Sequence, residues 1–493
     1  MNSSSNPTRR HRVKRLASLY GVRVADAPVC PGHSDPLTFL TEWLYDRPAL
    51  SVVHGPRGGG KSYLGGLRTH IDSQRFERHG TKILGGSLAQ SGQVYNALDD
   101  FNQARPGVIT RFAKQSAAYC TGSEVSILAA SATSVRGPHV PSLHLDEVDE
   151  IPADLRESAV GMCMAKHGVP ASITMTSTWH RVGGPMGTLK ERAAAEGIPW
   201  HTFCAFEILE RCPDDVSGPG LENCSSCPLK EWCHDVPPGT APKAKRANGH
   251  YPVASLVQKA RMVSRRVFEA DYLCLAPKAD GVWFAEFDPH LNVTEEAEYV
   301  PHLPVHLAID SGVRTGAVAF QVRPQSGWPP IVAVFWDYFS EGPGAESAAR
   351  AILGSLADRR GSKFRATTDP AGGARNSIGP TVIAEYERSG LRGIQAWPGG
   401  SVADALATVE ALVCGADGTR RLLIHPRCRN LINAMQNYRR AKVRDQWLDH
   451  PEDPQHPWED MVDALRGGLR AEFPEGFVQR EQFPRRSMHR IFY

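Results

Sequence analysis

The run ALSVVHGPRGGGKSYLGGL, residues 49–67, decides the fold of the first half of the chain. It reads as an apolar strand, a glycine-rich loop and the start of a helix, and Gly55 to Ser62 fits the pattern G-x-x-x-x-G-K-S/T at every fixed position. Glycines let backbone N–H groups turn inward onto phosphate oxygens, and the N-terminus of the following helix adds positive potential. A plain glycine turn is the alternative, but the strand before it and the helix after it favour a nucleotide-binding P-loop.

Each position of this loop has an expected chemical task. Lys61 would neutralise the β- and γ-phosphates of ATP, and Ser62 would hold Mg²⁺. Arg57 either reaches the γ-phosphate and stabilises the transition state, as a catalytic arginine, or is a solvated loop residue. The candidate nucleotide-binding residues of the loop are Gly55, Gly58, Gly60, Lys61 and Ser62.

A P-loop needs a carboxylate on a neighbouring strand, and residues 141–151, PSLHLDEVDEI, supply one. The apolar stretch ends in Asp146, which would bind Mg²⁺, and Glu147, which would polarise the attacking water as catalytic base. Asp149 and Glu150 follow on an expected loop, where we expect them to be solvated. The next expected strand, residues 173–178, ends in hydroxyl side chains and is either a γ-phosphate sensor or an ordinary buried strand.

The second half of the chain carries acids in the order strand, strand, helix. Asp310 lies on the first strand of an expected hairpin, VHLAIDSGVRTGAVAFQV, and Asp369 ends another expected strand in FRATTDPAGGARN. Asp460 and Asp463 begin an expected helix in HPWEDMVDALRGGLR and share one face because they are three apart. Any one acid could be a cap, turn or surface residue. The ordered set predicts a two-metal nuclease centre of the ribonuclease-H-like class, with Asp310, Asp369 and Asp463 as ligands and Asp460 in reserve.

Four cysteines crowd into residues 211–235, RCPDDVSGPGLENCSSCPLKEWCHD, with the spacing C-x11-C-x2-C-x5-C. A C-x2-C knuckle lets two sulfurs reach one ion from one turn, so Zn²⁺ or an iron–sulfur cluster fits. Four free thiols on a loop are the alternative, and Cys204 and His234 are possible substitute ligands. The expected ligands are Cys212, Cys224, Cys227 and Cys233.

The bulk properties are those of a globular protein with more than one domain. The chain has 493 residues, of which 41% are hydrophobic and 22% charged, and no apolar run approaches the ~18 residues of a membrane span. The basic N-terminus lacks an apolar stretch, so we expect no secretory signal. A net charge of +3 neither demands nor excludes nucleic acid. Two basic stretches, residues 243–266 and 427–444, either contact DNA phosphates or are solvated helix faces.

These motifs, taken in order, resemble the terminase large subunits of tailed bacteriophages. The resemblance rests on GPRGGGKS, SATSVRGPHVPSLHLDEVDEI with its Arg136-Gly137 pair, TMTSTWH, HLAIDSG, TTDPAGG and DMVDALRGG, and it covers roughly residues 50–470. It implies an α/β fold with an ASCE-type P-loop ATPase domain over residues 1–245, including a cysteine-rich insert at about 204–234. A basic linker would follow at 246–300, a ribonuclease-H-like nuclease domain at 301–475 and a tail at 476–493.

The resemblance also implies function, cofactors and partners. The function would be ATP-driven translocation of double-stranded viral DNA into a procapsid, with endonucleolytic cutting of the concatemer. Lys61, Ser62 and Asp146 would serve ATP and Mg²⁺, and Glu147 would be the catalytic base. Asp310, Asp369 and Asp463 would hold Mg²⁺ or Mn²⁺. The implied partners are the portal protein, the terminase small subunit and further copies of this chain in a ring, in the host cytoplasm and without a membrane.

Three other functions compete with this interpretation. A DNA translocase or helicase without nuclease activity explains the P-loop and Glu147 but leaves the acids of the second half unused. A transposase or junction nuclease explains those acids but not the P-loop. A metal-stabilised DNA-binding scaffold with a degenerate P-loop conflicts with the intact Gly60-Lys61-Ser62 run.

Overall fold

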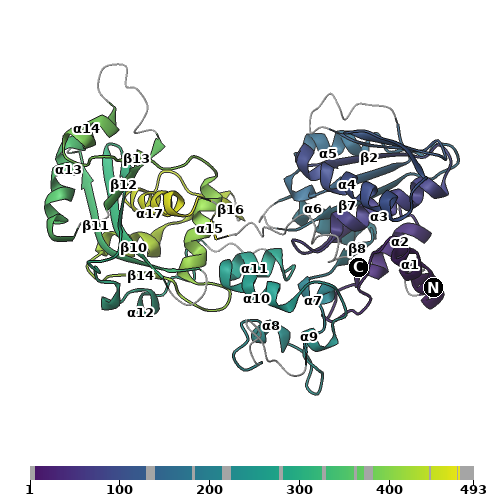
Figure 1. The fold of residues 1–493 in the computed structure, drawn as a ribbon, viewed down its shortest axis with the longest axis horizontal. Coiled ribbons are helices and arrows are strands. Elements are labelled where there is room, and N and C mark those ends of the chain that lie inside the picture. The colour runs from purple at the N-terminus through teal and green to yellow at the C-terminus, as the bar shows by residue number, and fades with distance from the viewer. Residues whose placement is uncertain are drawn as a thin grey trace. The chain divides into compact units, whose positions relative to one another are not determined.

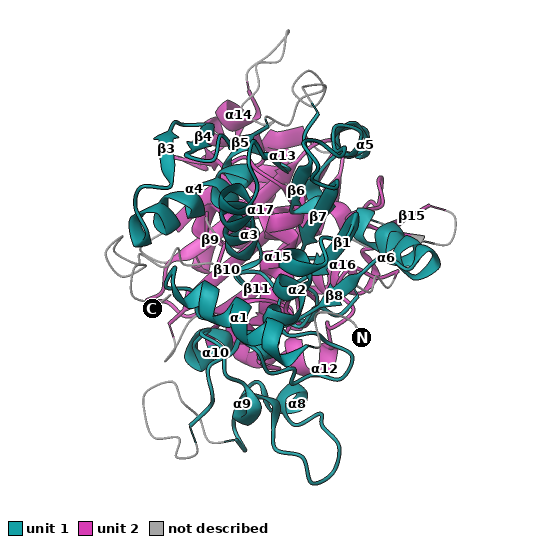
Figure 2. Cartoon of the chain, turned by 90° about the vertical axis from the view of Figure 1, so that its right-hand side faces the viewer, with its two compact units in different colours: residues 1–257, 269–277, 482–493 teal, residues 258–268, 278–481 magenta. Residues whose placement is uncertain are grey.

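The chain forms two compact units in the computed structural model (Figures 1 and 2). Unit 1 consists mainly of residues 1–257 with 269–277, and unit 2 of residues 258–268 with 278–481. The structure describes residues 6–128, 139–179, 184–213, 224–276, 281–324, 329–342, 344–359, 364–370, 381–443, 446–474 and 476–477. The Arg136-Gly137 pair, residues 214–223 of the cysteine-rich insert and nearly all of the expected tail lie outside these ranges.

Unit 1 is built on an eight-stranded sheet of order β3-β4-β5-β2-β6-β7-β1-β8. The strands β8, β1, β7, β6, β2 and β5 pair in parallel, and β3 and β4 add an antiparallel edge. β7 lies between the P-loop strand β1 and the acidic strand β6, so the ends of all three strands meet at one edge of the sheet. The bounds are β1 Leu50–His54, β2 Gly80–Gly85, β3 Ile109–Phe112, β4 Ser116–Tyr119, β5 Glu124–Ile127, β6 Ser142–Asp146, β7 Ser172–Ser177 and β8 Trp200–Thr202.

Helices cover both faces of this sheet, which is why its central strands β6 and β7 are buried along their whole length, although polar side chains alternate with apolar ones in both. Val53 packs in a cluster with helices α1 to α4, and its neighbour Val52 packs in another with α5 and α6. The helices of unit 1 are α1 Pro7–Ser18, α2 Pro36–Tyr45, α3 Lys61–Arg75, α4 Leu88–Ala104, α5 Ala153–Val160, α6 Pro185–Glu196, α7 Ala205–Ile208, α8 Lys230–Cys233 and α9 Lys243–Arg246; α10 Val253–Met262 and α11 Arg265–Asp271 contribute to both units.

Unit 2 is built on a six-stranded sheet of order β13-β12-β9-β10-β11-β14. β9, β10 and β11 form an antiparallel meander, and β12 pairs in parallel with β9. The strands are β9 Val305–Ser311, β10 Arg314–Arg323, β11 Ile331–Glu341, β12 Phe364–Thr368, β13 Gln395–Ala396 and β14 Leu422–Ile424; a separate pair comprises β15 Arg440–Val443 and β16 Gln446–Pro451.

Alternate residues of β10 pack against different helix layers of unit 2. Val318 and Phe320 join the cluster formed with α15, α16 and α17, whereas Ala317 and Ala319 join the cluster formed with α13 and α14. The helices are α12 Pro289–Asn292, α13 Gly344–Ser355, α14 Val382–Arg388, α15 Val402–Val413, α16 Arg429–Asn437 and α17 Trp458–Glu472. None of the described helices of either unit has the length and apolar character that a membrane crossing requires.

Helix α17 lies antiparallel to β9, at a distance that glycine makes possible. A Cβ atom at Gly316, which faces Asp310 across the β9–β10 ladder, would lie 2.5 Å from the backbone oxygen of Asp460. Further along, a Cβ atom at Gly468 would lie 2.5 Å from that of Ala308. Because these two glycines have no side chain, the N-terminus of α17 can pack against the carboxyl end of β9.

We predict that Gly468→Ala lowers the free energy of unfolding of this part of unit 2 by about 1–3 kcal/mol, because the added methyl group overpacks Ala308 and Phe320. Hydrogen exchange of peptides from β9 and β10 in the full chain measures the effect. Gly354→Ala is the matched control, since this exposed glycine of α13 has no other atom within 4 Å of its Cβ position. It should stabilise α13 by about 0.5–1 kcal/mol; destabilisation of equal size in both variants would contradict the close packing.

Candidate active sites and cysteine cluster

The P-loop connects β1 to α3 with a backbone that only glycine adopts easily. Gly58 and Gly60 have φ angles of +70° and +78°, in the left-handed region that disfavours other residues. Gly55 is needed for space instead, because a Cβ atom there would lie 2.5 Å from the ring of Phe203. All three predicted glycines therefore have a geometric reason.

Lys61 lies buried beneath the loop, where its ammonium group joins the loop to two neighbouring strand ends. Its Nζ donates to the backbone oxygens of Gly55 at 3.2 Å and Pro56 at 3.1 Å, and to Oγ1 of Thr178 at 3.0 Å. It also lies 3.4 Å from Oε1 of Glu147. Thr178 follows β7, so the hydroxyl end of that strand contacts the P-loop lysine directly.

Asp146 ends β6 with its carboxylate facing the first turn of α3. It accepts hydrogen bonds of 2.6 Å from Oγ of Ser62 and from Oγ1 of Thr176. Burial, and then the neighbouring Glu147 carboxylate, raise the pKa of Asp146 to about 6 against the effect of these hydrogen bonds. A buried acid beside a second acid gains stability from a cation, so the Ser62–Asp146 pair has the chemistry of a Mg²⁺ site.

Glu147 is held in a strained backbone conformation that turns its side chain toward the loop. Its φ is +51°, a left-handed value that costs a non-glycine residue about 1–3 kcal/mol. Its carboxylate accepts a hydrogen bond of 3.3 Å from the backbone N–H of Thr178, and its side chain stays 23% exposed. An acid that is positioned but still reached by solvent is suited to activate water.

The side chain of Arg57 lies at the rim of this site. It is 62% exposed, and its Nε contacts Oδ2 of Asp271 at 3.4 Å, while its backbone N–H donates to the oxygen of Asp271 at 2.7 Å. Asp271, the last residue of α11, did not emerge from the sequence, because nothing local marks it as a partner of a loop arginine. Arg57 is therefore exposed to solvent, as one of the two interpretations expected, but it also pairs with Asp271.

The two acids after Glu147 differ from each other. Asp149 was expected to be solvated, and this is wrong: it is 2% exposed and accepts a hydrogen bond of 3.2 Å from the backbone N–H of Met186. It anchors the start of α6, which the local sequence does not reveal. Glu150 is exposed and accepts a hydrogen bond of 2.6 Å from Nε2 of Gln90.

In unit 2 the predicted acids converge at the carboxyl ends of two parallel strands. Asp310 directly follows the buried part of β9, and Asp369 follows β12, whose Thr368 pairs with Ile309. The backbone N–H of Ser311 donates to Oδ2 of Asp369 at 3.4 Å. Burial raises the pKa of Asp310 to about 8, and the charges of Asp463, Asp369 and Asp460 raise it in that order. Divalent cations would remove the cost of such a cluster.

Asp463 and Asp460 have different partners on α17. Both oxygens of Asp463 accept hydrogen bonds of 2.6 Å from Arg466, one turn later on the same helix. Asp460 is almost completely buried and lies 2.9 Å from Nδ1 of His456. Arg466 was missed at the sequence level, although its i,i+3 spacing from Asp463 is a signal that could have found it.

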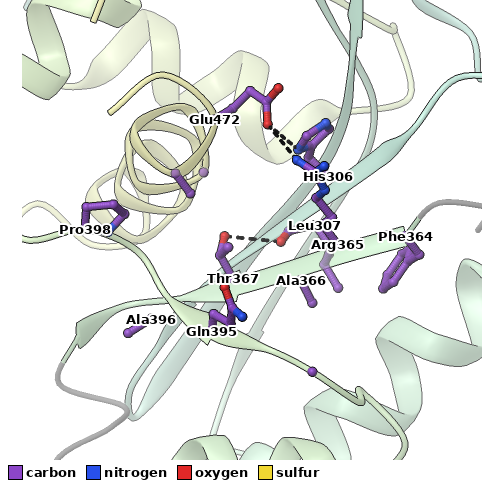
Figure 3. A pocket seen from close by; sticks show the side chains of 13 residues that line it. His306, Leu307, Phe364, Arg365, Ala366, Thr367, Gln395, Ala396, Pro398 and Glu472 are labelled. Atoms are coloured by element: carbon purple, nitrogen blue, oxygen red, sulfur yellow. Dashed lines mark hydrogen bonds and ion pairs between the residues drawn. The ribbon is translucent and has the colours of Figure 1, made fainter. Parts of the chain in front are cut away.

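A pocket of about 390 Å³ in unit 2 is separate from these acids (Figure 3). It lies over the earlier residues of β9 and β12 and the last turn of α17, where Glu472 contacts His306 at 3.3 Å and Arg365 at 3.5 Å. Burial, and then Arg365, lower the pKa of His306 to about 4, so its ring is neutral at pH 7. Because α17 is antiparallel to β9, the pocket and the acid cluster lie at opposite ends of this helix.

The four predicted cysteine ligands act on one another electrostatically, but no three of them in the described chain have sulfur atoms that all lie within 4.8 Å of one another. Burial raises the pKa values of Cys227 and Cys233, and the charges of the other thiols add to this effect. Sγ of Cys233 accepts a hydrogen bond of 3.5 Å from the backbone N–H of Ala244, whose oxygen accepts from the N–H of Cys212 at 2.8 Å. The possible substitute Cys204 lies elsewhere, with its Sγ 3.6 Å from that of Cys30.

The two basic stretches are only partly available to a ligand. Lys243 is 7% exposed, and Arg440 is 1% exposed and contacts Oε1 of Glu410 at 3.2 Å. Arg266 pairs with the same carboxylate group at 2.9 Å. These three cations serve internal packing and pairing, whereas Arg429 and Arg439 are exposed. The prediction that the stretches contact phosphates is therefore wrong for Lys243 and Arg440.

Comparison with known proteins finds relatives in structure only. No family model and no curated protein matches the chain. The large terminase from a thermophilic bacteriophage matches in its crystal form 2 with a TM-score of 0.58 and 12% identity, over 89% of this chain and 98% of that one. Crystal form 3 of the same protein gives a TM-score of 0.57 and 13% identity over the same shares. Its complex with ATP-gamma-S gives 0.51 and 12% over 88% and 97%. The predicted fold class is confirmed: the two units have the α/β fold of a bacteriophage large terminase.

Proposed function

We propose that the chain is the large subunit of a viral DNA-packaging terminase, in which an ATP-driven motor and a metal-dependent DNA endonuclease share one polypeptide. One observation carries the proposal. The same chain holds a P-loop lysine against a strand-borne acid pair and, in unit 2, an aspartate crowded by three further acids. The fold shared with the large terminase of the thermophilic bacteriophage, over 89% of this chain and 98% of that one, supports the proposal.

The residues of unit 1 fit ATP and Mg²⁺. Lys61 would bind the β- and γ-phosphates, and the Ser62–Asp146 pair would hold Mg²⁺, which neutralises phosphate charge during transfer. Glu147 would orient the water and accept its proton. Arg57 would add positive charge at the γ-phosphate from the rim of the loop. The thermophilic phage protein has been solved with ADP and with ATP-gamma-S, which supports a nucleotide at this position.

We predict that Glu147→Gln lowers ATP turnover by about 10²–10⁴-fold and leaves nucleotide binding intact. The amide keeps the shape of the side chain and can still accept from Thr178 N–H, but it cannot take a proton from water. Steady-state phosphate release and equilibrium binding of a fluorescent ATP analogue measure the two effects. Glu150→Gln, an exposed acid three residues later, is the matched control and should keep near-normal turnover. Normal turnover in Glu147→Gln would remove the assignment of a catalytic base.

The acid cluster of unit 2 fits two divalent cations held by Asp310, Asp369 and Asp463, with Asp460 as a further oxygen ligand. Carboxylates are hard ligands for Mg²⁺ and Mn²⁺. Such ions activate water and stabilise the leaving oxygen of a phosphodiester. Asp463 must exchange its contact with Arg466 for the cation, and the released guanidinium would then be free to meet a DNA phosphate.

We predict that Asp310→Ala, Asp369→Ala and Asp463→Ala each abolish plasmid linearisation by the full chain with Mn²⁺, while ATP hydrolysis survives. Asp358→Ala, an exposed acid of the same unit, should cut normally. Circular dichroism and the retained ATPase activity check that the variants fold.

The comparison of Asp463→Ala with Asp460→Ala decides the third ligand. If Asp460→Ala alone stops cutting, Asp460 replaces Asp463 in the centre. Normal cutting by Asp310→Ala would end the nuclease proposal and would favour the alternative, a DNA translocase without nuclease activity. The crowding of acids around Asp310 counts against that alternative, because without a cation it only destabilises the fold.

The cysteine cluster fits a structural metal ion, Zn²⁺ or an iron–sulfur cluster, held by Cys212, Cys224, Cys227 and Cys233. The C-x2-C spacing of Cys224 and Cys227 and the backbone N–H donor on Cys233 support this, because such hydrogen bonds orient metal-bound sulfur. The metal would link α8, which contains Cys233, to the segment around Cys212 that precedes it, and α9 contacts both through Ala244.

We predict that Cys227→Ser lowers the metal content of the purified full chain by about one zinc, or by the iron and sulfide of one cluster. Elemental analysis and the visible spectrum distinguish the two possibilities, since only an iron–sulfur cluster is coloured. Cys120→Ser, which changes an exposed cysteine, is the control and should leave the metal content unchanged. Equal metal content in all three proteins would exclude a metal at the cluster.

The proposed function also implies partners. Double-stranded DNA is the substrate of both activities, and exposed cations such as Arg429 and Arg439 are available to its phosphates. On the procapsid, in the host cytoplasm, the chain would bind a portal protein and a terminase small subunit. It would also form a ring with further copies of itself.

A further inference from the structure

A cluster of cysteine, histidine and glutamate side chains lies in unit 1 and shares no residue with the four predicted ligands Cys212, Cys224, Cys227 and Cys233. Its first half is the turn Cys30-Pro31-Gly32-His33, closed by a hydrogen bond of 3.2 Å from the N–H of His33 to the oxygen of Cys30. Proline at the second position and glycine with φ +74° at the third are typical of a type II turn. The turn brings the side chains of Cys30 and His33 to one side, and the N–H of Ser34 fixes it to the oxygen of Thr202 at 2.7 Å.

The second half of the cluster begins α7, just after β8. Cys204 and Glu207 form a capping box: the Cys204 sulfur accepts from the N–H of Phe206 at 3.4 Å, and Oε2 of Glu207 accepts from the N–H of Cys204 at 2.6 Å. Both residues are completely buried or nearly so. Burial of a carboxylate and a thiol side by side is costly unless their charges are met.

The two halves converge on one point. Sγ of Cys30 lies 3.6 Å from Sγ of Cys204, and Nδ1 of His33 lies 3.0 Å from Oε2 of Glu207. One ligand atom from each of the four residues lies within 4.8 Å of all the others. In tetrahedral zinc sites, Zn–S bonds of about 2.3 Å and Zn–N or Zn–O bonds of about 2.0 Å separate two sulfurs by about 3.8 Å and a nitrogen from an oxygen by about 3.3 Å. The observed separations are close to these values.

We infer that Cys30, His33, Cys204 and Glu207 bind a structural Zn²⁺ ion. The donor set, two sulfurs, one imidazole and one carboxylate in C-x2-H and C-x2-E pairs, supplies four ligands of the types that zinc accepts. Backbone N–H groups also orient these ligands. The N–H of Cys30 donates to Oε1 of Glu207 at 2.8 Å and the N–H of Cys204 to Oε2 at 2.6 Å, and the N–H of Phe206 donates to the Cys204 sulfur.

The position of this site gives it a consequence for the P-loop. Phe203, next to Cys204, packs directly on Gly55, and the backbone N–H of Phe203 donates to the oxygen of His54 at 3.1 Å. A Zn²⁺ ion would therefore link the segment before α2, which carries Cys30 and His33, to the residues beside Phe203 that pack against the P-loop. The inference is independent of the proposed function, since it rests on ligand geometry alone.

Metal content of the full chain tests the inference. The chain is purified with zinc supplied and no chelator, and zinc per chain is measured for the wild type, for Cys30→Ser combined with His33→Ala, and for Cys120→Ser. The combined variant should lose about one zinc relative to the wild type and the Cys120→Ser control. The loss should occur equally in a Cys227→Ser background, which separates this site from the one predicted at Cys212, Cys224, Cys227 and Cys233. An unchanged zinc content in the combined variant overturns the inference.

Ligand exchange keeps the test decisive if the combined variant does not fold. His33→Cys should retain the metal, and with Co²⁺ in place of zinc it should show a stronger thiolate-to-cobalt absorption band than the wild type, because it adds a third sulfur. An unchanged band overturns the inference. His33→Gln should bind zinc at least about 10-fold more weakly in competition with a chromophoric chelator. A Cys30–Cys204 disulfide in peptides from anaerobically purified chain would likewise overturn it, since oxidised sulfur does not ligate zinc.

Discussion

Burial of neighbouring carboxylates is the constraint on which both candidate active sites depend. Burial first, and then the charge of nearby acids, raise the pKa values of Asp146 in unit 1 and of Asp310 in unit 2 well above those of free side chains. Left to themselves such groups separate or bind protons. They stay together because parallel strands deliver their last residues to one sheet edge, and the sheets are fixed by cores buried on both faces. The rigid fold is therefore what makes cation binding favourable.

Close approach of backbones is the second requirement, and small residues meet it at both sites. In unit 1, Gly55 leaves room for the ring of Phe203, and in unit 2 Gly316 and Gly468 let α17 lie directly on β9 and β10. Backbone contacts of this kind place Asp460 and Asp463 without using the acids' own side chains. The helix is held by other atoms, so the Asp463 carboxylate can exchange its hydrogen bonds with Arg466 for a cation without loss of the packing.

The sequence predicted the fold class and most of the residues that meet at these sites, because both depend on local patterns. The P-loop pattern specifies glycine, lysine and serine at fixed spacing, and strand-end acids are visible as breaks in apolar runs. The sequence could not predict that Asp271 contacts Arg57, or that Asp149 is buried against the start of α6. Both contacts join segments that lie far apart in the chain. For the same reason the sequence did not reveal the cluster at Cys30. Its partners Cys204 and Glu207 begin a helix that follows β8, far from Cys30 in the chain.

The raised pKa of Asp310 links the stability of unit 2 to the ionic composition of its surroundings. The unfolded chain loses this proton near pH 4, whereas the folded chain keeps it to about pH 8, so folding becomes less favourable as the pH rises through that window. A divalent cation that binds only the folded unit reverses this loss by mass action. Near neutral pH, Mg²⁺ or Mn²⁺ would then add to the free energy of unfolding of unit 2, and its resistance to proteolysis would rise with cation occupancy before any DNA is cut.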